Sequence, residues 1–241
     1  MAGHNKWSKI KRDKGVNDAK RGAVFTKIGN MIAIAARGGT DPTMNSALAL
    51  AIEKARQANM PKDNIQRSID RAADKNAAQL EEATYEGYGP GGIGIIVETA
   101  TDNKNRTYPE VRTALTKNGG TMADAGSVMF QFTRKGVIRV ATTGEDALLA
   151  VLDAGAEDAV EEEEGLTVYT EMKDLAKVRT AIVAAGLAVE DAELQYVPNN
   201  LVEITDEEVA RKIMKILDAI DDVDDVVNVH TNADIAVDID S

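Results

Sequence analysis

The first third of the chain carries apolar residues at helical spacing. Val24, Ile28, Met31 and Ala35 fall at i, i+4, i+7 and i+11, which predicts an amphipathic helix. The pair Gly38–Gly39 follows this stripe, and glycine is favoured just after a helix because it tolerates positive φ. We therefore predict that the first helix ends at these two glycines.

Two more helices are predicted before residue 78. Asp41 is a good N-cap residue and Pro42 suits the first helical position, so the second helix should begin there. The segment Asn59–Pro61 then breaks it, and a third helix follows. The buried faces should consist of Met44, Leu48, Ala51, Ile52 and Ala55 on the second helix, and of Ile65, Ile69 and Ala72 on the third.

From Leu80 onward the pattern changes to strands that alternate with helices. The spacing of Ile93, Ile95 and Val97 is typical of a half-buried strand, and a Thr205 to Glu208 capping box predicts the start of a late helix. The elements of four β-α-β units are predicted at 93–97, 111–115 and 128–132; at 137–141, 148–152 and near 159; at 166–170, 175–182 and up to 196; and at 201–204, 209–220 and 226–231.

Two β-α-β units make one ferredoxin-like domain, so the fold class is α+β with a helical N-terminal domain and two ferredoxin-like domains. We favour an arrangement in which one of these domains is inserted in the other, because the last unit needs a partner. The expected domains are 1–78, 79–134 together with 197–241, and the inserted 135–196. Two α+β domains in series are the alternative.

Charge is distributed very unevenly along the chain. The net charge of the 241 residues is -12, which by itself argues against a polyanionic partner. However, residues 1–75 contain 15 Lys and Arg against 7 Asp and Glu, whereas residues 76–241 contain 13 against 33. A basic N-terminal segment therefore precedes an acidic body, and the basic part is expected to bind nucleic acid. Because Asp63 and Arg67 offset each other on the third helix, we expect the basic surface on the segment before the first helix and on that helix.

Composition also restricts the compartment and the chemistry. The chain has no cysteine, so it contains no disulfide, thiol nucleophile or cysteine-ligated metal. The apolar runs are shorter than the roughly 18 residues that a membrane-spanning helix needs, and the N-terminus lacks the apolar core of a secretion signal. We expect a cytoplasmic protein with no membrane partner.

The sequence lacks the common catalytic and nucleotide-binding motifs. There is no G-x-S-x-G, H-E-x-x-H or P-loop, and we assign no catalytic role to His4 or His230. Gly87–Gly92 matches G-x-G-x-x-G but precedes a strand, so a domain-joining turn is favoured over a dinucleotide site. The acidic runs Asp221–Asp225 and Glu161–Glu164 are interpreted as solvated edges. We therefore predict no catalytic residue, no cofactor, no metal and no small-molecule substrate.

The candidate nucleic-acid-binding residues are mostly basic and lie near the N-terminus. Trp7 is the only tryptophan, and an indole among lysines can stack on an unpaired base or anchor the segment to the helices. The candidates are Lys6, Trp7, Lys9, Lys11, Arg12, Lys14, Lys20, Arg21, Lys27 and Arg37.

A secondary polar loop is predicted at 101–107, where a strand ends and a helix begins. Asn103, Asn105 and Arg106 are candidates there for reading a phosphate or a base edge, because free backbone N–H groups at a helix start favour an anion. The alternative is that Asn and Thr simply cap the helix.

Several blocks of the sequence resemble the signature segments of the YebC/PmpR family. They are Gly3–Lys11, Lys20–Gly22, Phe25–Lys27, Ala36–Pro42, Asn59–Pro61, Tyr85–Pro90, Thr101–Thr107 and Gly126–Val128. The resemblance implies three domains, with one α+β domain inserted in the other, and no enzymatic activity or cofactor. It also implies either a DNA-binding transcriptional regulator or a translation factor that acts at the ribosome.

The sequence thus predicts a non-enzymatic, nucleic-acid-binding regulator of gene expression, expected to be a monomer. The first alternative is a ribosome-associated translation factor that binds ribosomal RNA, since a single basic segment with one tryptophan suits structured RNA. The second alternative is a module that docks other proteins through its sheets and acidic surface.

Overall fold

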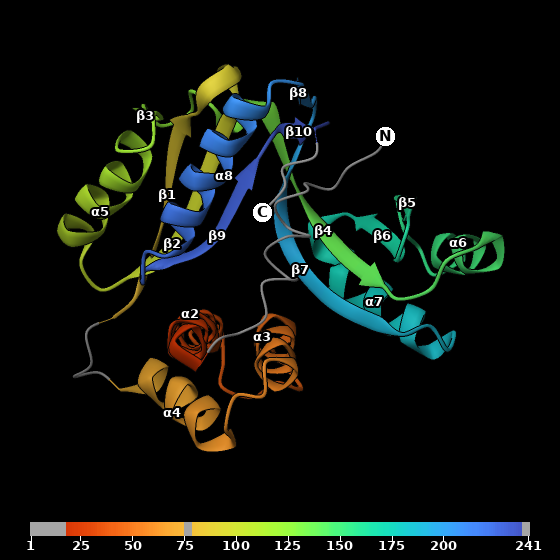
Figure 1. Cartoon of the computed structure of the whole chain (residues 1–241). Helices are drawn as coiled ribbons and strands as arrows, with labels where there is room; N and C mark the ends of the chain where they lie inside the picture. The colour runs from red at the N-terminus through yellow and green to blue at the C-terminus, as the bar shows by residue number, and fades with distance from the viewer. Residues whose placement is uncertain (1–17, 75–78, 238–241) are drawn as a thin grey trace. The chain divides into compact units, whose positions relative to one another are not determined.

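The computed structural model describes residues 18–74 and 79–237, with side chains from residue 21 onward. The described chain forms two compact units. One unit is residues 133–197, and the other combines the chain before it with the chain after it. The class is α+β, with N-terminal helices followed by sheets, as predicted (Figure 1).

Three helices open the larger unit: α2 (Asp18–Ala36), α3 (Ser46–Gln57) and α4 (Lys62–Ala73). They pack around a common core in which Ile32 of α2 and Leu48 of α3 are fully buried (Figure 1). The predicted stripes on the helices supply this core, because side chains three and four residues apart share one helix face. The existence of all three helices is confirmed.

The predicted start of the second helix is wrong. Asn45 is the N-cap of α3, and its side chain accepts a hydrogen bond from the N–H of Leu48 at 3.1 Å. Asp41 instead accepts hydrogen bonds from the N–H and hydroxyl of Thr43, which stabilises a separate turn. Met44 therefore precedes the helix and is 87% exposed, not part of the buried face.

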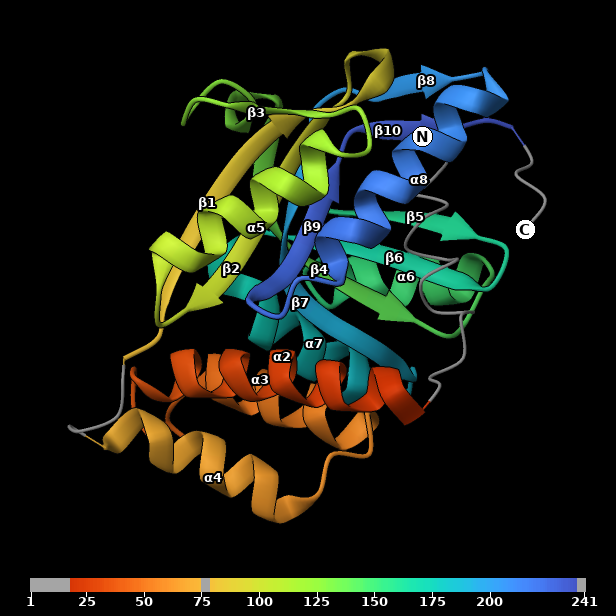
Figure 2. The same cartoon turned by 60° about the vertical axis from the view of Figure 1, so that its left-hand side comes forward.

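The main sheet of the larger unit has four antiparallel strands. They are β1 (Glu81–Tyr88), β2 (Gly94–Thr101), β3 (Thr121–Ala123) and β9 (Val226–Thr231), in the order β3-β1-β2-β9. The helices α5 (Lys104–Thr116) and α8 (Glu207–Asp221) lie side by side on one face (Figure 2). Their apolar faces and β2 share one core, which includes Leu115 and Leu217. The short strands β8 (Val202–Ile204) and β10 (Ala233–Ile235) pair in parallel beside it.

The strand β2 is buried on both faces, so the half-buried prediction is wrong. Ile95 and Val97 belong to the core under α5 and α8. Ile96 points to the opposite face and is also fully buried. The helix α2 lies against β2 and β9, which brings the helical segment next to the sheet.

Two other sequence expectations fail in this sheet. Residues 128–132 do not form a strand: Met129–Gln131 is a 3-10 turn (η2), and Phe130 is 73% exposed. The glycine-rich segment forms the hairpin between β1 and β2, with its own 3-10 turn at Pro90–Gly92 (η1), and it does not join domains. The sequence did not reveal β1, because its side chains are largely polar and exposed.

The smaller unit contains most of β4 (Phe132–Val140), followed by α6 (Glu145–Asp153), β5 (Asp158–Glu162) and β6 (Gly165–Thr170). A 3-10 turn at Met172–Asp174 (η3) leads to α7 (Leu175–Ala184), and β7 (Val189–Pro198) ends the unit. The strand order β5-β6-β4-β7 with this sequence of elements is the split β-α-β arrangement of ferredoxin-like domains (Figure 1).

The boundaries of α8 also differ from the sequence expectation. Asp206, not Thr205, is the N-cap, and its carboxylate accepts a hydrogen bond from the N–H of Val209 at 2.9 Å. The predicted apolar stripe is confirmed, since Ile213, Leu217 and Ile220 are fully buried. None of the helices within 18–74 and 79–237 is both long and apolar enough to cross a bilayer.

Candidate nucleic-acid interface

Most of the predicted basic site lies outside the described residues. This applies to Lys6, Trp7, Lys9, Lys11, Arg12 and Lys14, and to the side chain of Lys20, whose backbone belongs to α2. Of the remaining candidates, Arg21 and Arg37 are exposed and Lys27 is half-buried.

Two of these described basic residues are engaged in contacts inside the protein. The Lys27 ammonium lies 3.2 Å from Oδ1 of Asp221 and also donates to the carbonyl oxygen of Asp221, at the last residue of α8. Arg37 donates from Nη1 to the carbonyl oxygen of Leu80 at 2.8 Å. Both residues therefore connect the helical segment to the α+β part of the same unit.

We predict that Lys27→Met lowers the free energy of unfolding by about 1–2 kcal/mol, because a lysine at the last carbonyl groups of a helix is favourable and this one is only 13% exposed. Urea unfolding followed by circular dichroism measures the change. The exposed Lys62 provides the control, and Lys62→Met should change stability by less than about 0.5 kcal/mol. Equal effects of the two substitutions would contradict a specific role for the Lys27 contact.

A groove of about 400 Å³ runs between α2 and α4. Phe25 and Asn30 line it from α2, and Asn64, Arg67 and Arg71 line it from α4. The sequence did not reveal this groove, because Arg67 was expected to be offset by Asp63. In the structure Arg67 donates to the carbonyl oxygen of Asp63 and to Oδ1 of Asn64, which are neutral acceptors.

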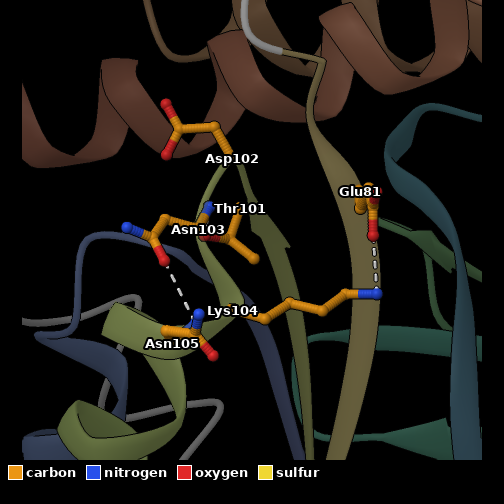
Figure 3. Close-up of a pocket in the computed structure, with 6 residues that line it drawn as sticks. All are labelled: Glu81, Thr101, Asp102, Asn103, Lys104 and Asn105. Carbon is orange, nitrogen blue, oxygen red and sulfur yellow. Dashed lines mark hydrogen bonds and ion pairs between the residues drawn. The ribbon is translucent and has the colours of Figure 1, made fainter.

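The secondary polar loop surrounds a small pocket of about 230 Å³ at the start of α5 (Figure 3). The side chain of Asn103 caps the helix, accepting hydrogen bonds from the N–H groups of Asn105 at 3.1 Å and Arg106 at 3.3 Å. Lys104 pairs with Glu81 across the pocket at 2.6 Å, and this hydrogen bond lowers the pKa of Glu81 and raises that of Lys104 (Figure 3). The loop thus has the helix-capping geometry that the sequence allowed as its alternative.

The third candidate in this loop, Arg106, binds a buried carboxylate. Its Nη2 lies 2.8 Å from Oδ2 of Asp225, which also accepts hydrogen bonds from the hydroxyls of Thr101 at 3.0 Å and Thr107 at 2.6 Å. Burial alone would raise the pKa of Asp225, but the hydrogen bonds from Thr107, Arg106 and Thr101 outweigh burial and lower it. Asp102 is a second partner of Arg106, at 3.1 Å.

The acidic runs are not simply solvated edges, as the sequence suggested. Asp225 is 7% exposed, and Asp221 holds Lys27. In the other run, the Glu162 side chain is 8% exposed; it lies 3.7 Å from Arg139 and accepts a hydrogen bond from Thr167. These carboxylates stabilise the fold through partners that are distant in sequence.

Two observations bear on catalysis and metal binding. Within residues 21–74 and 79–237, no three His, Asp or Glu side chains come together in a way that could hold a metal ion. His230, which the sequence did not favour as a catalyst, is buried and lies 2.8 Å from the Glu98 carboxylate across β2 and β9. His4 lies outside the described residues.

Family models match nearly the whole chain. Residues 5–75 match the TACO1/YebC protein N-terminal domain, and residues 80–233 match the TACO1/YebC second and third domain.

Relatives of similar length are known. A protein of Thermobifida fusca named "Probable transcriptional regulatory protein" is 51% identical, with 99% of this chain and 98% of that protein covered. A protein of Desulfotalea psychrophila with the same description is 48% identical, with 98% and 96% covered. The crystal structure of a conserved hypothetical protein of Aquifex aeolicus is similar to this structure, with a TM-score of 0.87, 40% identity, and 92% of this chain and 93% of that chain covered.

Proposed function

Since the chain belongs to the TACO1/YebC family, we propose that it is a non-enzymatic, nucleic-acid-binding regulator of gene expression that acts in the cytoplasm as a monomer. The observation that carries the proposal is the charge distribution, with an excess of Lys and Arg in residues 1–75 and an excess of Asp and Glu after them. The names of the relatives support regulation of transcription as the first form of this function.

The basic N-terminal segment supplies the main contact in this proposal. Its lysines and arginines neutralise phosphates, a largely sequence-independent interaction that releases counterions, and Trp7 stacks on an unpaired base. Lys27 and Arg37 contribute less to phosphate binding, because their side chains already hold the α+β part of the unit. The acidic body orients the complex by repelling phosphates.

A second form of the function is translation control at the ribosome. It is favoured by the single basic segment with one tryptophan, because stacking on unpaired bases is typical of RNA recognition and two-fold DNA half-sites need a repeated reading element. In a third form the chain docks another protein through its acidic α+β part.

We expect the wild-type protein to bind nucleic acid with an affinity that falls steeply as salt rises, by a log–log slope of about 0.9 per duplex phosphate contacted. Mobility shifts with duplex DNA and with an RNA hairpin, and cosedimentation with 70S ribosomes, should be compared at matched salt. Preference for the duplex supports transcription, and preference for ribosomes or the hairpin supports translation. Absence of binding to all three partners at low salt rejects the proposal, and full binding after deletion of Met1–Arg21 points to protein docking.

A further inference from the structure

The groove between α2 and α4 combines apolar, amide and cationic groups in one place. Phe25 is half-buried on the α2 side, where Asn30 is buried deeper in the wall. Asn64 lines the α4 side, together with the exposed Arg67 and Arg71. A volume of about 400 Å³ falls within the usual range of small-molecule sites, roughly 300–1,000 Å³. The groove is therefore large enough for a single nucleotide.

The charge of the groove is positive. Arg67 donates to neutral oxygens of Asp63 and Asn64, so its cation is not neutralised by these contacts. Arg71 donates to Oδ1 of Asn30 at 3.4 Å, and its guanidinium lies 3.7 Å from the Asp102 carboxylate, a long and partly exposed ion pair. No lining residue that the structure describes is acidic. Two guanidinium groups beside amide side chains match a phosphate next to a polar base edge.

We propose that this groove binds one unpaired nucleotide of a single-stranded RNA, as a second contact beyond the basic N-terminal segment. The inference rests on the proposed function, because the N-terminal segment supplies the first contact with the same strand. Arg67 and Arg71 hold the phosphate, Phe25 supplies an aromatic surface for the base, and Asn30 and Asn64 supply hydrogen bonds.

The shape of the groove favours a single strand. Its walls are the side chains of two packed helices, so a base must leave its stack to enter, which unpaired nucleotides do most easily. The hydroxyl of Ser68 and the amides of Asn30 and Asn64 both donate and accept, as the ribose 2′-OH does. These groups favour RNA over single-stranded DNA.

Two pairs of substitutions test the groove without changing the protein core. Gly22 lies in α2 at the groove, and a Cβ built there has no neighbour within 4 Å, so Gly22→Leu can occupy the groove while Gly22→Ala leaves it open. Arg67→Gln removes one charge from the groove, and Lys62→Gln removes one exposed charge from the same helix outside it. Thermal unfolding checks that each variant folds, and each pair tests the proposal independently of the other.

Fluorescence anisotropy of a labelled single-stranded RNA, of a length within ~4–16 nucleotides, measures the effect. We expect Gly22→Leu and Arg67→Gln each to weaken binding by about 5- to 10-fold, and Gly22→Ala and Lys62→Gln by less than about 2-fold. The same RNA annealed to its complement should bind all four variants within about 2-fold of the wild type.

The outcomes separate the groove from the general function. If each groove variant binds the single strand as well as its control does, the groove proposal is overturned, while binding by the wild type leaves the proposed function intact. An equal loss on single-stranded DNA of the same sequence overturns the assignment to RNA. If the wild type binds none of these nucleic acids, the proposed function itself fails.

Discussion

Replacement of Asp225 by Ala should lower the free energy of unfolding by about 2–4 kcal/mol. The buried carboxylate accepts hydrogen bonds from Thr101, Arg106 and Thr107, and its loss leaves two buried hydroxyls and a guanidinium with fewer partners. The carboxylate also joins the end of β2, the start of α5 and the residue before β9. Urea unfolding followed by circular dichroism measures the loss.

Asp224 provides a matched control for this substitution. It is adjacent in sequence and carries the same charge, but its side chain is exposed. Asp224→Ala should therefore change stability by no more than about 0.5 kcal/mol. Similar losses at the two positions would show that net charge, and not the hydrogen-bonded network of Asp225, determines the effect.

The contribution of Asp225 should also depend on pH. Because its pKa is lower in the folded protein, the stabilisation is fully present above the unfolded pKa of about 3.9 and disappears as the pH falls through the folded pKa. The difference in stability between the wild type and Asp225→Asn should therefore be largest near neutral pH and shrink below about pH 4. A difference that stays constant down to pH 2 would contradict the role of the ionised carboxylate.

The parts of the fold that the sequence predicted correctly depend on local periodicity. The stripe on α8 is buried as expected, because helical spacing alone places Ile213 and Leu217 on one face. Helix ends were harder to predict, since Asp41 and Asn45 are both good caps and only the path of the chain decides between them. The strand β1 was missed because its burial depends on neighbouring strands and not on its own alternation.

The functional candidates depend on contacts between distant parts of the chain. Arg106 and Asp225 are 119 residues apart in sequence, and Lys27 and Asp221 are 194 apart, so no local pattern indicates that these charges pair. The groove between α2 and α4 likewise appears only when the two helices pack, because its cations come from one helix and its aromatic ring from the other. The excess of basic residues at the N-terminus, by contrast, is a property of the sequence itself.

Substitution of Lys9, Lys11, Arg12, Lys20 and Arg21 by Ala should weaken nucleic-acid binding by about 100- to 1,000-fold near physiological salt. If each side chain contacts one duplex phosphate, the log–log salt slope should also flatten by up to about 4.5, since each contact contributes about 0.9. Mobility shifts over a series of salt concentrations measure both quantities. The flattened slope is the more specific result, because it reports how many counterions the protein releases.

A control variant with the same loss of charge distinguishes a local contact from an effect of net charge. Lys117, Lys173, Lys177, Lys212 and Lys215 are exposed and lie in the acidic body. Their replacement by Ala also removes five positive charges, but it should change affinity by less than about 5-fold and leave the salt slope intact, because salt screens charges that lie beyond a Debye length of about 8–10 Å. Equal losses in the two variants would mean that total charge governs binding, and the N-terminal segment would then not be the contact surface.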